Sequence, residues 1–214
     1  MKKLVFGLLL LLTAGSFSSC EDKDKIPAPT VKSTPLIFPI ITADKSYYIW
    51  SRARAAESTN PVRPVFEFTI DLGDQRDVQI KTVEIYKSYR RGSTLGPRVL
   101  AREVSSFPAT ITMDSQEAIT GLKRLVLQDA PAKPYLVDVR ASSPTAPNSQ
   151  IVISDQIVFT FEYVLQDGSR VITTPLTNVQ VQENAAGGAI STIQVISGTQ
   201  INAPYAAIAQ FKAS

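Results

Sequence analysis

The feature that most constrains the fold is a strict alternation of apolar and polar residues. Residues 156–176 read QIVFTFEYVLQDGSRVITTPL, and one face of this stretch collects Ile157, Phe159, Phe161, Tyr163 and Leu165. Successive side chains of a strand point to opposite faces, so the alternation predicts a strand rather than a helix. Asp167-Gly168 predicts a two-residue hairpin turn that sets Tyr163 opposite Ile172 on the returning strand.

The same alternation recurs along much of the chain. In PVFEFTIDL (64–72) the apolar face holds Phe66, Phe68 and Ile70. The pattern in residues 78–86 changes phase near Thr82, which predicts a β-bulge or a strand break there because a one-residue slip reverses the faces. A single short helix is expected after Asp114, which is a suitable N-cap residue. Further strands are predicted at 97–104, 109–113, 135–140 and 178–182.

About seven or eight short strands at fairly even spacing predict an all-β domain, specifically an antiparallel β-sandwich similar to immunoglobulin and fibronectin-III domains. A partly open barrel is the alternative. The sandwich is expected to span residues 37–183. Residues 184–214 are low in charge and are expected to form a low-complexity tail or a loosely packed extension, in which STIQVI (191–196) is a strand candidate.

The N-terminus has the three parts of a secretory signal. Lys2 and Lys3 precede an apolar run from Leu4 to Leu12, and small residues follow. The run is shorter than the roughly 20 apolar residues that a membrane-spanning helix needs. The only cysteine of the chain, Cys20, stands directly after this signal.

The sequence SFSSC at this point resembles the lipobox of bacterial lipoproteins, with Phe17 where an aliphatic residue is usual. The resemblance implies that residues 1–19 are removed and that Cys20 is acylated on its sulfur and its amine. Two or more acyl chains anchor a protein stably to a membrane. Residues 20–36 hold several charges and prolines, and they are expected to form a flexible tether.

The acidic stretch EDKD after Cys20 resembles the export signal of surface lipoproteins in Bacteroidota-type bacteria. This resemblance implies a cell-envelope protein in the outer membrane, exposed at the cell surface. The chain is also similar to small accessory lipoproteins, some of which lie beside glycan-uptake transporters. The partners implied are the membrane, through the acyl groups on Cys20, and an outer-membrane protein or a polysaccharide.

Composition narrows the possible chemistry. The chain has no histidine and one cysteine, so Ser-His-Asp catalysis and histidine or thiolate metal sites are excluded. We expect a non-enzymatic protein without cofactor or metal. A hydrolase built on the carboxylates of Glu67, Asp71 or Glu162 is a remote alternative to a solvated sheet face. Removing residues 1–19 leaves 20 of the 22 basic residues against 19 acidic ones, so no net charge favours nucleic acid.

Residues 81–103 form a basic segment with interleaved tyrosines. Arginine offers planar donor pairs to carboxylates and phosphates, so this segment is a candidate contact for an acidic glycan, lipid headgroups or an acidic partner. The alternative is a soluble hairpin whose charges protect a sheet edge. The candidate contact residues are Lys87, Tyr89, Arg90, Arg91 and Arg98.

A second candidate is the aromatic cluster SYYIWSR (46–52), with Tyr47, Tyr48 and Trp50. Aromatic faces stack on sugars and anchor protein interfaces. Alternation would instead bury Tyr48 and Trp50 in the core. We therefore expect a lipid-anchored binding or assembly module, and a glycan-binding accessory protein of a polysaccharide-uptake system is the alternative.

Overall fold

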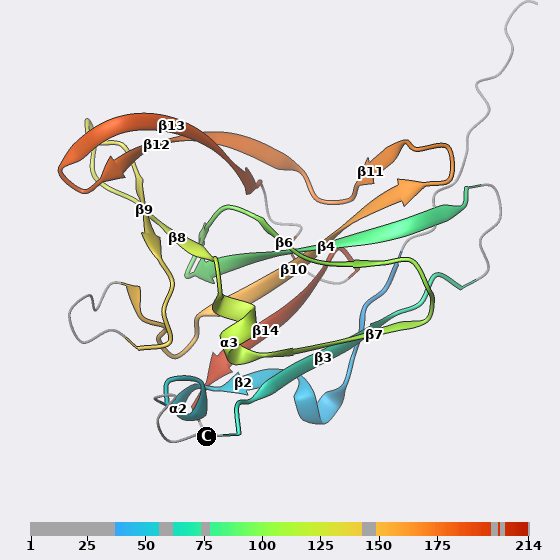
Figure 1. Ribbon diagram of the computed structural model, residues 1–214. Coiled ribbons are helices and arrows are strands. Elements are labelled where there is room, and N and C mark those ends of the chain that lie inside the picture. Colours follow the sequence, from blue (N-terminus) through green and yellow to red (C-terminus); the bar gives the residue numbers. More distant parts are fainter. Residues whose placement is uncertain are drawn as a thin grey trace, which may run out of the picture. The chain divides into compact units, whose positions relative to one another are not determined.

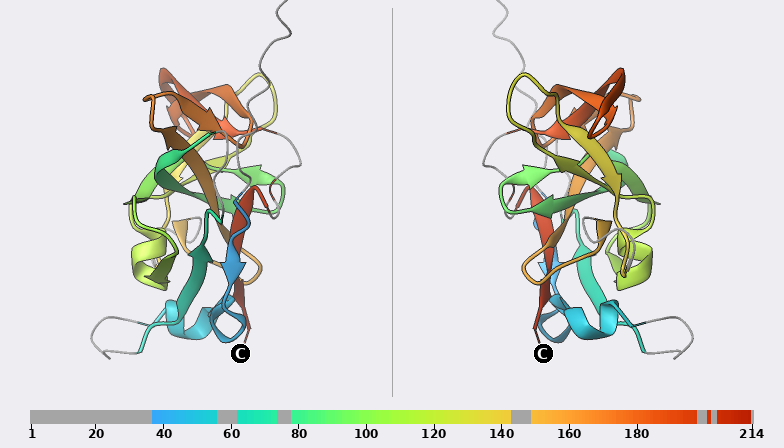
Figure 2. Two further views of the ribbon diagram at one scale, coloured as in Figure 1. Left: turned by 90° about the vertical axis from the view of Figure 1, so that its right-hand side faces the viewer. Right: turned by 90° about the vertical axis from the view of Figure 1, so that its left-hand side faces the viewer.

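A computed structural model describes residues 37–55, 62–73, 78–142, 149–197, 201 and 204–213 (Figure 1 and Figure 2). The predicted signal peptide, Cys20 and the predicted tether up to residue 36 lie outside the described residues, and what the sequence predicts for them stays a prediction. The described part is built mainly of strands with a few short helical turns. The predicted all-β class is therefore confirmed.

The described strands form three sheets. The first sheet has the order β1 (Ile40–Ile41), β3 (Val65–Ile70) and β7 (Ala109–Asp114). The second has the order β2 (Tyr47–Ile49), β14 (Ala206–Lys212), β10 (Gln156–Leu165), β4 (Ile80–Arg91) and β5 (Thr94–Leu95), with β11 (Arg170–Ile172) paired to β10 and β6 (Val99–Val104) paired to β4. The third has the order β13 (Gly187–Ile196), β12 (Leu176–Asn184), β9 (Tyr135–Asp138) and β8 (Lys123–Val126). The helical elements are η2 (Ala43–Lys45), α2 (Trp50–Ala53) and α3 (Ser115–Ile119).

Two strand pairs depart from the expected antiparallel arrangement. β2 pairs with β14 in parallel, and so does β9 with β12. Parallel neighbours need a long connection, and each of these pairs joins segments far apart in the sequence. Local alternation describes a single strand and carries no information about such distant pairing.

An aromatic core joins the first sheet to the second. Phe66 of β3 stacks on Phe159 of β10, with ring centroids 5.6 Å apart and planes 6° apart. Phe68 meets the edge of Phe161 at 6.0 Å. These are the residues that the alternation placed on inward faces, and all of them are buried. The sheet-on-sheet contact is thus made by the predicted faces of β3 and β10.

The opposite face of the second sheet is covered as well. Val158 of β10 and Ala206 of β14 pack with Ile196 of β13, and the same cluster includes Leu95 and Ile201. The central strands of the second sheet are therefore enclosed from two sides. A strand covered on both faces can bury polar residues only if they are paired or hydrogen-bonded. Charged residues of these central strands must therefore have partners inside the domain.

In the part of segment 184–214 that the structure describes, the chain forms paired strands rather than a tail or a loose extension. β13 contains the STIQVI segment, and β14 lies between β2 and β10 inside the second sheet. Ala207, Ala209 and Phe211 belong to the aromatic core. The expectation failed because a strand buried on both faces lacks alternation with polar residues. Its small, uncharged side chains resemble low complexity, although they allow close packing in the sheet centre.

The predicted β10–β11 hairpin exists, but its register differs by one residue. Tyr163 pairs with Val171 rather than with Ile172. The Leu165 N–H donates to the Ser169 carbonyl at 2.9 Å, which leaves Gln166, Asp167 and Gly168 in a three-residue loop. Gly168 has a φ of +82°, as the last position of such a loop requires. The extra loop residue shifts the returning strand.

Two other local predictions are confirmed. Thr82 pairs with Val164 and Ile80 with Leu165, so Lys81 forms a bulge next to the predicted position. Asp114 caps α3, where its Oδ1 accepts hydrogen bonds from the Gln116 and Glu117 N–H groups at 2.7 and 2.9 Å. Short-range sequence signals therefore identify these local features correctly.

The position of β14 predicts a large effect of Phe211→Ala. Phe211 is 0% exposed and Phe38, just before β1, is 59% exposed. Removing a buried phenyl ring costs about 3–5 kcal/mol of unfolding free energy. Phe38→Ala makes the same chemical change at the surface and should stay within about 0.5 kcal/mol of the parent. Urea unfolding measures both variants, and equal stabilities would show that the segment is a tail.

Candidate functional site: a basic pocket between two short helices

The basic segment of β4 is held largely by a buried carboxylate. Asp155 is 1% exposed, and its oxygens accept hydrogen bonds from Arg91 Nε at 2.8 Å and Arg91 Nη2 at 2.7 Å. The Tyr89 hydroxyl also donates to Asp155, and so does the Val152 N–H at 2.6 Å. The bonds to Asp155 raise the pKa of Arg91, and burial raises the pKa of Tyr89. Arg91 and Tyr89 are therefore engaged inside the domain.

A second ion-pair network covers the other face of the same strands. Arg98 binds Glu162 at 2.5 Å, and Arg170 binds Glu162 at 3.1 Å and also Glu84. The Arg98 guanidinium lies over the Tyr86 ring, 4.3 Å from its centroid. Burial opposes ionisation of Glu84, but hydrogen bonds from Arg170 and Tyr86 outweigh it and hold the pKa of Glu84 below its ordinary value. Arg98 is thus part of an internal network.

Lys87 faces the aromatic core, because it pairs with Phe159 across β4 and β10. Its Nζ donates to the Glu117 carbonyl at 2.6 Å, and burial lowers the pKa of Lys87. Arg90 is the half-buried exception, with its Nε bonded to the Gly92 carbonyl at 3.0 Å. The five candidate residues therefore do not form one contact surface. The physical reason is that β4 lies between β10 and β6 in a sheet covered on both faces.

The aromatic cluster 46–52 is divided between core and surface. Tyr48 is fully buried, stacks on Phe211 at 5.2 Å and donates its hydroxyl to the Met113 carbonyl at 3.2 Å. Its burial takes it out of reach of a ligand, as alternation indicated. Tyr47 is exposed, with Lys212 Nζ 4.9 Å from its ring centroid.

Trp50 begins α2 and is partly buried against the core. Its indole Nε1 donates to the Ile151 carbonyl at 3.2 Å. One turn further on, the Arg54 guanidinium lies 4.8 Å from the Trp50 ring centroid. This stacking connects the predicted aromatic cluster to a cavity that the sequence did not predict.

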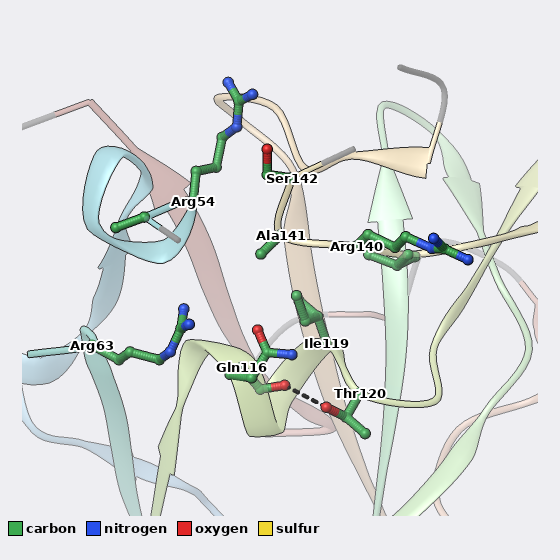
Figure 3. Close-up of a pocket in the computed structure, with 10 residues that line it drawn as sticks. Arg54, Arg63, Gln116, Ile119, Thr120, Arg140, Ala141 and Ser142 are labelled. Carbon is green, nitrogen blue, oxygen red and sulfur yellow. Dashed lines mark hydrogen bonds between the residues drawn. The ribbon is translucent and has the colours of Figure 1, made fainter. Parts of the chain in front are cut away.

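The cavity lies between α2, α3 and the segment after β9, and it measures about 480 Å³ (Figure 3). This volume falls in the range of roughly 300–1,000 Å³ that is usual for small-molecule sites. We call it the arginine pocket. Its lining residues are Arg54, Ala55, Arg63, Gln116, Ile119, Thr120, Val139, Arg140, Ala141 and Ser142.

All charged residues that line the arginine pocket are basic. Arg54 Nη2 donates to Gln150 Oε1 at 2.8 Å, and Arg63 Nη1 donates to the Ala53 carbonyl at 3.3 Å, so both guanidiniums are held by neutral acceptors. Among the described residues, no aspartate or glutamate lines the pocket. The guanidinium of Arg140 extends away from those of Arg54 and Arg63 in Figure 3.

Three described acidic residues close in sequence to the pocket are engaged elsewhere. Asp114 caps α3, Glu117 forms an ion pair with Arg102, and Asp138 lies 3.9 Å from Lys123 Nζ. The Nε of Arg54 is buried without a hydrogen-bond partner among the described residues. Guanidiniums without a carboxylate form a binding site for an anion, because they supply several fixed donors to one planar or tetrahedral group.

The remaining lining can hold the uncharged part of a ligand. Gln116, Thr120 and Ser142 are polar, and the Thr120 hydroxyl donates to the Gln116 carbonyl at 2.7 Å (Figure 3). Ile119 and Val139 add an apolar surface. The arrangement suits a small molecule or polymer unit that carries a carboxylate, sulfate or phosphate together with hydroxyl groups.

Sequence reasoning did not identify the three arginines of the pocket. They are isolated in the sequence, and each comes from a different part of the chain. The one available signal was the proximity of Arg54 to Trp50. That Arg54 and Arg63 line one cavity depends on how α2 and the segment before β3 approach α3, which no local pattern encodes.

Within the described ranges, no group of three or more His, Cys, Asp or Glu side chains is placed to hold a metal ion. The search for membrane-spanning helices in the same ranges found none that is both long and apolar enough. Comparison with protein-family models, curated proteins and solved structures finds no match for this chain.

Two neighbouring arginines of β4 provide a matched test of the Asp155 network. Arg91→Ser removes the partner of a buried carboxylate and should cost about 3–5 kcal/mol of unfolding free energy. Arg90→Ser makes the same change one residue earlier, where no ion pair is lost, and should stay within about 0.5 kcal/mol. Thermal and urea unfolding measure both. Equal effects would contradict the structural role of Arg91.

Proposed function

We propose that this protein is a lipid-anchored, non-enzymatic binding module of the outer membrane, and that its arginine pocket holds an anionic ligand. The observation that carries the proposal is that Arg54 and Arg63 both line a cavity with no described carboxylate. The lipobox-like SFSSC sequence supports the anchor, and the EDKD stretch supports exposure at the cell surface.

The ligand we propose is an acidic glycan. Its carboxylate or sulfate would bind the guanidiniums, and its hydroxyls would meet Gln116, Thr120 and Ser142. This is the glycan-binding alternative in a specific form, with recognition through charge rather than through stacking on Tyr47 or Tyr48. The rival ligand is an acidic side chain of a partner protein, which favours assembly with an outer-membrane protein.

The non-enzymatic part of the proposal rests on the engagement of the candidate carboxylates. Glu67 accepts from Lys45 at 2.7 Å and from Thr112 at 2.9 Å, and these bonds hold the pKa of Glu67 below its ordinary value. Glu162 is buried in its ion pairs, and Asp71 accepts from the Gly73 N–H at 3.0 Å. None of the three lines the arginine pocket.

We also propose that the first two sheets form a sandwich related to immunoglobulin and fibronectin-III domains. The packing of the two sheets through the stacked Phe66–Phe159 pair and the edge contact of Phe68 with Phe161 supports this relation. The third sheet and the two parallel strand pairs would then be additions to the sandwich plan.

Trp50 gives a direct assay for the pocket, because it is the only tryptophan of the chain and Arg54 stacks on it. We expect oligogalacturonate to change Trp50 fluorescence, and an equal amount of a neutral glucan to leave it unchanged. Arg63→Gln should weaken the response at least tenfold, since a lost charged hydrogen bond costs about 1.5–3 kcal/mol.

Arg52→Gln is the matched control, because Arg52 lies in α2 two residues from Trp50 but lines a separate cavity of about 180 Å³. Its titration should match the parent. Equal weakening in both variants would mean that the response reflects general surface charge, which would contradict a pocket-specific site. No response to any acidic oligosaccharide, with an intact fold, would shift the proposal to an acidic protein partner.

The anchor is tested separately by Cys20→Ala. Loss of the thiol removes the acylation site, and no described helix replaces it as an anchor. We expect the variant to leave the membrane fraction, while the parent stays there after a high-salt wash and takes up labelled fatty acid. Membrane retention of Cys20→Ala would contradict a lipid anchor.

A further inference from the structure

β13 is a long edge strand with an unusual composition. It extends over ten residues, Gly187–Ile196, and stands at the end of the third sheet. Its partner among the described strands is β12, on one side. The sequence GGAISTIQVI contains no charged residue and no proline. Figure 1 shows β12 and β13 as a long curved hairpin.

Several other described edge strands carry the usual protection against pairing, whereas β7 at the edge of the first sheet has a charge only at its last residue, Asp114. β8 at the opposite end of the third sheet carries Lys123 and Arg124, and β6 carries Arg102 and Glu103. β1 and β5 have two residues each. Natural proteins protect edges with charge or short length, because an edge strand offers unpaired N–H and C=O groups. β13 has neither form of protection.

Part of β13 is open to another chain. Residues 188–192 are exposed, and Ile190 is 58% exposed although it is a large apolar residue. Val195 and Ile196 are buried, and Ile196 packs in the second core. Gly187 and Gly188 have φ values of +116° and +112°, outside the β region, so the accessible regular edge runs from Ala189 to Gln194, which is still long enough for an antiparallel ladder.

We propose that β13 pairs antiparallel with β13 of a second copy of this chain around a two-fold axis. An uncharged strand is its own electrostatic complement, because self-pairing places no like charges opposite each other. The same patch is used on both copies, so the interface closes as a dimer. The pairing would join two four-stranded sheets and bury the exposed Ile190 side chains.

Cysteine scanning tests this pairing in the full-length protein, because Cys20 is the only native cysteine. Single substitutions Ala189→Cys, Ile190→Cys, Ser191→Cys, Thr192→Cys and Ile193→Cys would be oxidised under mild conditions. A disulfide forms where Cβ atoms approach to about 3.5–4.5 Å. Antiparallel pairing around an axis therefore predicts a covalent dimer at one or two neighbouring positions and little at the others.

Three controls accompany the scan. The parent chain measures any cross-linking through Cys20, and Lys123→Cys measures random collision at the charged edge strand β8. Adding a Thr192→Lys or Ile190→Lys substitution to a cross-linking variant should reduce the dimer at least fivefold, because it places like charges near the axis. Circular dichroism checks that the added charge, at an exposed position, leaves the fold intact.

The outcomes are distinct on a non-reducing gel. A dimer confined to one or two scan positions and suppressed by the added lysine supports the proposal. It is overturned if all positions stay monomeric, if they match Lys123→Cys, or if the band contains a different protein. A ladder of higher oligomers also overturns it, because a two-fold pair uses up both edges.

Discussion

The Asp155–Arg91 ion pair is the contact on which much of the structure depends. The Asp155 carboxylate accepts hydrogen bonds from Nε and Nη2 of Arg91 and from the Tyr89 hydroxyl, and these bonds join it to β4. Its backbone carbonyl accepts the Phe211 N–H at 2.8 Å, which joins it to β14. A buried carboxylate is costly unless its oxygens are fully bonded, so the three segments must meet together. The pair thereby couples the C-terminal strand to the centre of the second sheet.

The same contact positions the arginine pocket. Arg91 Nη2 donates to the Gln150 carbonyl at 2.7 Å, and the Gln150 side chain accepts from Arg54. The neighbouring Ile151 carbonyl holds the Trp50 indole. Segment 149–155 is thus fixed on one side by β4 and holds α2 on the other. Because Arg54 is already held by Gln150 and Trp50, its side chain would lose less conformational entropy on binding a ligand.

Sequence reasoning succeeded where a single strand or turn decides the outcome. The alternation around Phe66 and Phe159, the bulge near Thr82 and the Asp114 cap all follow from neighbouring residues. It failed for β14, whose alanines lack a polar face because both faces are buried. The arginine pocket was missed for a related reason, since Arg54, Arg63 and Arg140 line one cavity only through tertiary packing.

The second sheet is covered on both faces, which also explains which charged side chains are left free to bind a ligand or partner. The richest basic stretch, in and after β4, is used internally by Asp155, Glu162 and the Glu117 carbonyl. Charge density along a sequence is therefore a poor guide to a binding surface when the strand is central. The features left open are those at the margins of the sheets, namely the arginine pocket beside α2 and the edge of β13. A ligand in the arginine pocket and a second copy of the chain at the β13 edge would contact different elements, so both contacts could form at the same time.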